Sequence, residues 1–167
     1  MQYIEAPNEE PARGPSLFLA GGITGVKDNW QAKAALELKD IELLTIFNPR
    51  RKAEFKPEDE EEQIKWEHNK LYRADAISFW FPPDTLCPIT LYELGAWSVW
   101  IDPWKQIRSH KRLFISVHPK YARLNDVLIQ TKLARPDVEV RVEETFSTQP
   151  IRDWLVPPPA TVTAMFR

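Results

Sequence analysis

One glutamate of this chain, Glu93, stands where carboxylate chemistry is expected. It lies in the segment 89–95, shortly after an apolar run at 76–81 that has the length of a buried strand. A helix that begins at about residue 89 would hold Glu93 in its first turn, beside the carboxyl end of that strand. Open α/β sheets bind their ligands at this edge, so Glu93 is a candidate nucleophile.

A structural role for Glu93 is the alternative. Thr90 and Glu93 have the spacing of a capping box, in which the glutamate only satisfies a backbone N–H at the helix start. Capping boxes are far more common than nucleophilic glutamates, so the segment by itself leaves both roles open.

The rest of the chain has the alternation of a sheet with crossover helices. Short apolar runs alternate with amphipathic segments, which is typical of parallel α/β folds. Strands are expected at 16–20, 43–47, 76–81, 113–117 and 138–142. Helices are expected at 28–39, 57–72, 89–101, 121–134 and 149–155.

These elements predict an α/β fold of the flavodoxin or Rossmann-like three-layer type, with five parallel strands in the order 2-1-3-4-5. A crevice is then expected between the carboxyl ends of the strands at 16–20 and 76–81. Gly21, Gly22 and Ile23 follow the first of these strands, and glycine there lets backbone approach a ligand closely. We therefore include all three among the candidate binding residues.

Composition limits the classes of protein. With 167 residues, 43% of them hydrophobic, the chain fits one domain over 1–167. We expect 1–14 and 157–167 to be extended tails or to pack on a partner. A formal charge of -2 gives no field that would hold a nucleic acid polymer.

Neither a membrane segment nor a metal site is expected. No apolar run approaches the length of a membrane helix and no basic-then-apolar leader opens the chain, so a cytoplasmic location is the default. The single cysteine, Cys87, and three scattered histidines lack metal-site spacing.

Five segments in order resemble the nucleoside 2-deoxyribosyltransferases and their relatives, the deoxynucleotide N-hydrolases. The resemblance covers about 17–117 and is carried by Leu19-Ala20-Gly21-Gly22-Ile23-Thr24-Gly25, Asn48-Pro49-Arg50-Arg51, Ile64-Lys65-Trp66-Glu67, Ala74-Asp75-Ala76-Ile77 and Tyr92-Glu93-Leu94-Gly95. It favours the catalytic role of Glu93 over the capping role.

What the resemblance implies is base exchange on 2'-deoxyribonucleosides. Glu93 would attack the anomeric carbon to form a covalent deoxyribosyl ester, without a cofactor, and a free nucleobase would collect the sugar. Glu67 stands where the family usually has the aspartate that protonates the leaving base. A helix start would favour the ionised form of Glu93.

Other residues are candidate ligand contacts, and one of them raises the alternative of an N-hydrolase. Asn48 is expected either to bind sugar or base or to form an Asx-type turn. Arg50, next to Arg51, could bind a phosphate, as in an N-hydrolase of deoxynucleosides or nucleotides. Thr24 and Cys87, however, replace the arginine and serine that the hydrolase branch uses, which favours a free 5'-hydroxyl.

Aromatic and partner contacts complete the expected site. Phe81, nearest the end of its strand, is our candidate for stacking on a base. The resemblance implies a homo-oligomer in which a neighbour closes the site, with Asn125 and Asp126 as the candidate contributors. A non-catalytic module that binds nucleosides or nucleotides with the same fold remains a third possibility.

Overall fold

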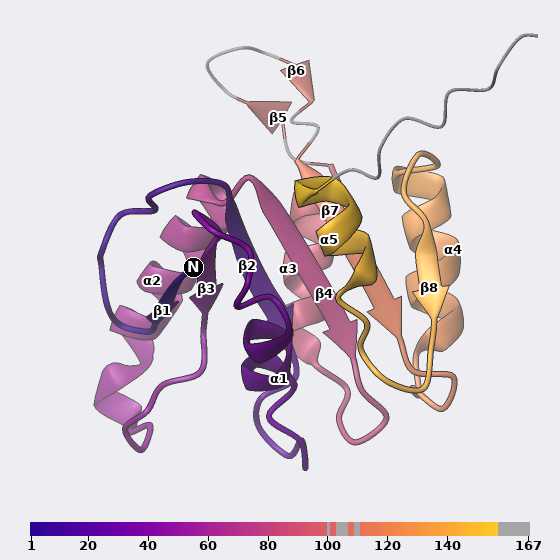
Figure 1. Ribbon diagram of the computed structural model, residues 1–167. Helices are drawn as coiled ribbons and strands as arrows, with labels where there is room; N and C mark the ends of the chain where they lie inside the picture. Colours follow the sequence, from indigo (N-terminus) through magenta and orange to yellow (C-terminus); the bar gives the residue numbers. More distant parts are fainter. Residues whose placement is uncertain (100, 103–106, 109–110, 157–167) are drawn as a thin grey trace, which may run out of the picture.

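The computed structural model describes residues 1–99, 101–102, 107–108 and 111–156, and a six-stranded parallel sheet forms its centre (Figure 1). The strands run in the order β1-β3-β2-β4-β7-β8. Their bounds are β1 Gln2–Glu5, β2 Ser16–Gly21, β3 Thr45–Asn48, β4 Ala76–Phe81, β7 Arg112–Val117 and β8 Val140–Val142. A separate antiparallel pair joins β5 Ile101–Asp102 to β6 Ile107–Arg108.

Helices cover both faces of the sheet, which gives three layers (Figure 1). On one face lie α1 Trp30–Glu37 and α5 Gln149–Leu155. On the other lie α2 Glu60–Arg73, which follows the 3-10 turn η1 Pro57–Asp59, α3 Pro88–Ser98 and α4 Leu124–Ala134. No helix among the described residues is long and apolar enough to cross a membrane.

Successive side chains along each strand point to opposite faces of the sheet, and they contribute to two separate hydrophobic cores. In β2, Phe18 and Ala20 belong to the core shared with α2, α3 and α4, whereas Leu17 and Leu19 belong to the core shared with α1 and α5. All six residues of β4 are buried. A parallel sheet that is covered on both faces requires such continuous apolar strands, which explains why the strands were recognisable in the sequence.

The α/β fold and the strand order are confirmed, with one strand more than expected. From β3 to β8 the order is the predicted 2-1-3-4-5, and β1 is added outside β3. Residues 2–5, which we expected in a tail, pair in parallel with Thr45 to Asn48. An edge strand is buried on one side only, so its short polar sequence carried little signal.

Beyond β1, the N-terminal segment is attached to α2. The indole Nε1 of Trp66 donates a hydrogen bond to the carbonyl of Asn8 at 2.7 Å. The buried Lys70 pairs with Glu9 at 2.9 Å, and its Nζ lies 5.3 Å from the ring centre of Phe47. This segment is therefore part of the domain's packing, whereas the 157–167 tail lies outside the described residues.

Helix α3 begins earlier than the sequence indicated. Cys87 is its N-cap in the left-handed region, with φ 46°, and Pro88 is the first helical residue, a position that suits proline. Thr90 is then inside the helix, so the capping box is wrong. Glu93 lies in the second turn rather than the first.

Candidate active site

A cavity of about 540 Å³ opens at the carboxyl ends of β2, β3 and β4. The loops that follow these strands form part of its wall, and α2 and α3 form the rest. Glu67 on α2 and Glu93 on α3 both line it. The cavity is thus at the place where the strand order reverses, as expected for a ligand site in an open α/β sheet.

Gly21, the last residue of β2, and Gly22 after it are required by close packing. A Cβ at Gly21 would lie 2.6 Å from Cζ2 of Trp30 and 2.7 Å from the carbonyl oxygen of Trp80. A Cβ at Gly22 would lie 2.9 Å from Sγ of Cys87. Only glycine therefore fits at Gly21 against α1 and β4, and at Gly22 against the β4–α3 loop. Both glycines, with Ile23, line the cavity.

Glu93 is half-buried, and its surroundings favour the neutral form. Burial, with the charge of Glu67 as the second cause, raises the pKa of Glu93 from 4.5 to about 8. We had expected a helix start to favour the anion, but Glu93 lies beyond the first turn, where the dipole effect has faded. The carboxyl is therefore poised to hold a proton near neutral pH.

Glu67 reaches the cavity from α2 and, unlike Glu93, accepts a hydrogen bond from another described side chain. The amide Nε2 of Gln63, one turn earlier, donates to Oε1 of Glu67 at 2.7 Å. Burial raises the pKa of Glu67, while this hydrogen bond and the charge of Arg51 lower it. The two carboxyl groups together favour one shared proton, because two charges so placed repel each other.

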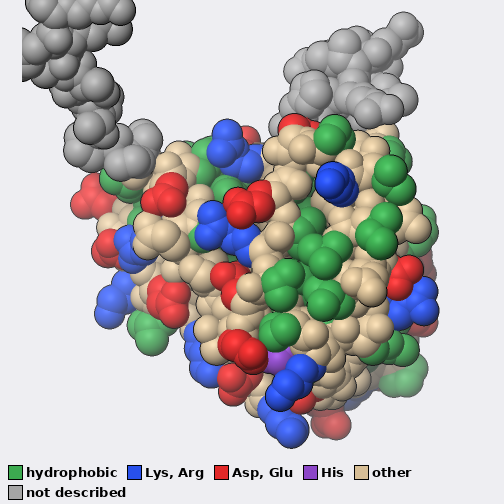
Figure 2. All heavy atoms as spheres, turned by 90° about the vertical axis from the view of Figure 1, so that its right-hand side faces the viewer, with side chains coloured by type: hydrophobic (Ala, Val, Ile, Leu, Met, Phe, Trp, Pro, Cys, Tyr) green, Lys and Arg blue, Asp and Glu red, His purple; other side chains and the backbone are tan. Residues whose placement is uncertain are grey.

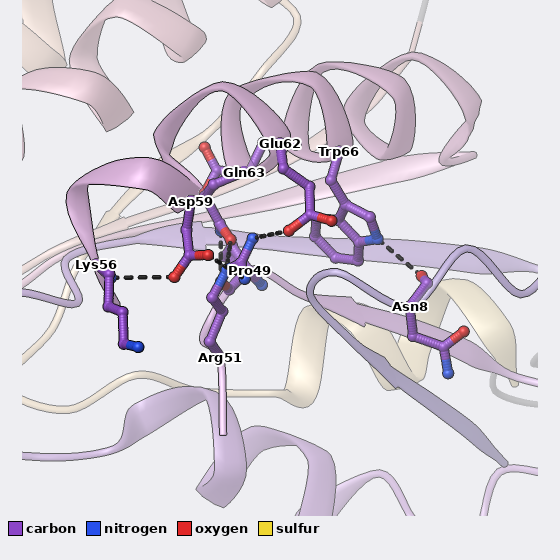
Figure 3. Close-up of polar contacts among 9 residues, drawn as sticks. Asn8, Pro49, Arg51, Lys56, Asp59, Glu62, Gln63 and Trp66 are labelled. Atoms are coloured by element: carbon purple, nitrogen blue, oxygen red, sulfur yellow. Dashed lines mark hydrogen bonds and ion pairs between the residues drawn. The ribbon is translucent and has the colours of Figure 1, made fainter. Parts of the chain in front are cut away.

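The two adjacent arginines have different surroundings. Arg51 donates from Nε to Gln63 at 2.7 Å and from Nη2 to Glu62 at 2.6 Å (Figure 3). Arg50 lines the cavity, and its Nη2 reaches Gln31 at 3.4 Å. Within the described residues its buried Nε has no hydrogen-bond partner. Arg50 therefore has one buried donor that the described residues do not match, whereas Arg51 is committed to the protein.

Two candidate ligand contacts lie outside the cavity wall. Asn48 is fully buried, accepts a hydrogen bond from the N–H of Arg50 at 3.1 Å and donates to Tyr3 at 2.6 Å. This is the Asx-type turn that we had set against ligand binding. Phe81 is also fully buried and packs on Tyr121 with ring centres 5.2 Å apart. The ligand roles of both residues remain predictions without support from this geometry.

The candidate partner-side residues lie on α4. Asn125 is exposed, and Asp126 pairs with Arg123 at 2.9 Å. Neither lines the cavity of its own chain. Figure 2 shows the side of the molecule with α4 and β8, where hydrophobic side chains gather among charged ones; exposed residues of these two elements include Ile129, Leu133 and Val142. Contact with a neighbour through this side remains a prediction.

Sequence reasoning missed several lining residues. Phe55 and Gln63 line the cavity, as do Thr85 and Thr90. Phe55 is half exposed and offers the aromatic surface that we had assigned to Phe81. Gln63 had one available signal, since it lies four residues before Glu67 on the same helix face. Phe55 and Thr85 are brought in by loops, whose paths local patterns do not specify, and Thr90 lies in the first turn of α3.

Cys87 borders the cavity as a thiol. Burial raises the pKa of its thiol to about 11, so a thiolate nucleophile is disfavoured. Among the described residues, no group of three or more His, Cys, Asp or Glu side chains is placed to hold a metal ion.

The fold and the cavity define an α/β domain that presents a pair of carboxyl groups at the switch point of its sheet. A family model described as nucleoside 2-deoxyribosyltransferase like matches residues 14–100, more than half of the chain. The chain belongs to this family, as the resemblance indicated. No curated protein sequence matches it. The matched span includes the first glycine loop and both glutamates.

Proposed function

We propose that the protein exchanges the base of 2'-deoxyribonucleosides through a covalent deoxyribosyl ester on Glu93. The observation that carries the proposal is that Glu67 and Glu93 line one cavity and interact electrostatically. Family membership supports a deoxyribosyl-transferring or related enzyme. The cavity volume lies within the range of small-molecule sites, roughly 300–1,000 Å³.

In the first step, a carboxylate oxygen of Glu93 attacks C1' of the deoxyribose while the C1'–N bond breaks. The bond's electron pair goes to the base, and Glu67 supplies a proton to a ring nitrogen of the departing base. This step requires the shared proton on Glu67 rather than on Glu93. A partial negative charge from Glu93 stabilises the oxocarbenium-like transition state.

In the second step, an incoming base attacks C1' and releases Glu93 as the carboxylate. Glu67, now ionised, accepts the proton that the incoming base loses, so the site returns to its starting state. Each step inverts C1', and two inversions retain the β configuration. Gly21, Gly22, Ile23 and Arg50 are the proposed substrate contacts, and a cytoplasmic nucleoside-salvage role and a homo-oligomer belong to the same proposal.

The test is a transfer assay with deoxyinosine as donor and adenine as acceptor, followed by chromatography. Deoxyadenosine that forms only with adenine present, and not with the Glu93→Ala variant, supports transfer. Hypoxanthine released without a new nucleoside identifies a hydrolase. Ligand binding without any product would identify the non-catalytic module instead.

Arg50 favours one second candidate, an N-hydrolase that acts on deoxynucleoside monophosphates. Arg50 lines the cavity, and the described residues offer its guanidinium no carboxylate within ion-pair distance. A phosphate would satisfy it. Faster base release from a deoxynucleoside 5'-monophosphate than from its nucleoside, lost in Arg50→Met, would establish this activity.

A further inference from the structure

We infer that Gln63 and Arg51 form a relay that positions Glu67 and leaves only its Oε2 atom free to carry the transferred proton. The inference rests on the proposed function, in which Glu67 is the general acid and base. Gln63 and Arg51 are assigned as positioning residues, since they act through Glu67.

The relay consists of three short contacts around one amide. Oε1 of Gln63 accepts from Nε of Arg51 at 2.7 Å. Nε2 of Gln63 donates to the carbonyl of Pro49 at 2.7 Å and to Oε1 of Glu67 at 2.7 Å. Figure 3 shows Gln63, Pro49 and Arg51 close together, with a dashed contact from the Arg51 guanidinium to Glu62.

The neighbours determine which way the amide points. A guanidinium can only donate, so the atom of Gln63 that faces Arg51 is its oxygen. A carbonyl can only accept, so the atom that faces Pro49 is the nitrogen. The second N–H of that nitrogen is therefore directed at Glu67, and the reverse orientation would oppose two donors and two acceptors.

The consequence for Glu67 is a distinction between its two oxygens. Oε1 already accepts the amide N–H, so a proton on Oε1 would face a donor. Among the described residues, no hydrogen bond occupies Oε2. The proton that Glu67 gives to the leaving base, and later recovers from the incoming base, therefore resides on Oε2.

The same amide connects two walls of the cavity. Pro49 precedes Arg50 on the loop after β3, while Glu67 belongs to α2. Because Gln63 bonds to both, the loop and the acid hold a constant separation. Arg51 stays in place because its Nη2 pairs with Glu62 at 2.6 Å and its Nη1 lies 3.8 Å from Asp59.

The test removes the donor while keeping the size of the side chain. Gln63→Met abolishes all three contacts, and Gln63→Glu keeps the contact with Arg51 but can no longer donate to Glu67. Lys65→Met is the matched control, since Lys65 is exposed on the same helix and pairs only with Glu61 among the described residues. The Glu67 carboxyl is titrated by carbon-13 NMR of glutamate-labelled protein, with Glu67→Gln to assign its signal.

The NMR titration is expected to show a pKa of Glu67 raised by about one unit in both Gln63 variants and unchanged in Lys65→Met. In the transfer assay, kcat is expected to fall about tenfold or more while KM changes less than about threefold. An unchanged Glu67 titration in Gln63→Glu would overturn the relay, as would a fall in kcat equal to that of the control.

The two proposals fail separately. If the wild-type protein releases no base from any nucleoside or nucleotide, the proposed function fails, and the NMR titration still decides whether Gln63 controls Glu67. If transfer occurs and the titration does not move, the relay alone is wrong. Should Gln63→Met fail to fold, Gln63→Leu, which also removes the amide donor without adding a charge beside Glu67, gives the decisive titration.

Discussion

Two acidic side chains at opposite edges of the sheet have opposite surroundings. Asp75, at the amino end of β4, accepts hydrogen bonds from the N–H of Ser16 at 2.8 Å and from its hydroxyl at 2.7 Å. Glu93, at the carboxyl edge, lines the cavity, and none of the described residues donates a hydrogen bond to its carboxylate. One carboxylate accepts two hydrogen bonds from Ser16, and the other accepts none from the described residues.

The difference shows how one residue class serves two purposes. A carboxylate that accepts several hydrogen bonds stabilises the fold and is a poor nucleophile, because its lone pairs are engaged. A carboxylate held in a cavity without donors costs stability but keeps its lone pairs available. The amino edge of this sheet therefore contributes stability, and the carboxyl edge offers reactivity.

The largest expected effect is on turnover in Glu93→Gln. The amide keeps the size of the side chain but cannot form the deoxyribosyl ester, so base exchange should fall by at least about a thousandfold. Chromatographic product assays measure this fall, and circular dichroism checks the fold. Residual exchange within tenfold of the wild type would show that Glu93 is not the nucleophile.

Glu67→Gln should have the next largest effect. The amide cannot protonate the leaving base, so kcat should fall about a hundredfold while KM stays within about threefold. Nucleosides with a better leaving base should lose less activity, since they need less protonation. An equal loss for good and poor leaving bases would contradict the general-acid role.

At the other edge, Asp75→Asn should affect stability instead of activity. The variant loses the charge on an exposed carboxylate that accepts two hydrogen bonds from Ser16, so the free energy of unfolding should fall by about 0.5–1.5 kcal/mol. Urea unfolding measures the change, and Asp28→Asn in the exposed pair with Lys33 is the control. A large loss of kcat without a loss of stability would remove the contrast between the edges.

The smallest effect concerns the pH dependence of stability. Glu93 has a pKa of about 8 in the folded chain against an ordinary value of 4.5, so between these values the folded state binds more protons than the unfolded state. The free energy of unfolding should therefore fall as pH rises from about 4.5 to about 8. This fall in the free energy of unfolding is limited in size, because the cavity exposes Glu93 to solvent on one side.

Comparison with Glu93→Gln isolates this contribution. Urea unfolding at several pH values should show a shallower decrease in the variant than in the wild type. Parallel curves for the two proteins would mean that folding does not raise the pKa of Glu93.

Much of the fold was accessible from the sequence, and the exceptions have local causes. Helix α5 was predicted with its observed bounds, and β4 likewise, since Pro150 near the helix start and a six-residue apolar run are strong signals. Strand β1 was missed because only one of its sides is paired. The start of α3 was missed because Cys87 adopts a left-handed conformation that non-glycine residues rarely take.

The candidate site divides in the same way. Some site residues belong to short segments that the sequence places beside strand ends or on a helix. These residues line the cavity as expected: Gly21, Gly22, Glu67 and Glu93. Asn48 and Phe81 were placed near the right edge, but their side chains point into the protein interior. A position at a strand end does not specify on which side the ligand lies.

By itself, the sequence determined the layered α/β architecture, the order of five strands and the family. These follow from hydrophobic periodicity and short motifs, which are properties of neighbouring residues along the chain. Tertiary structure alone decided which carboxylates accept hydrogen bonds from the protein and which do not. Hydrogen bonding and desolvation depend on atoms far apart in the chain: Ser16 meets Asp75, and Arg51 meets Gln63, only once the sheet has assembled.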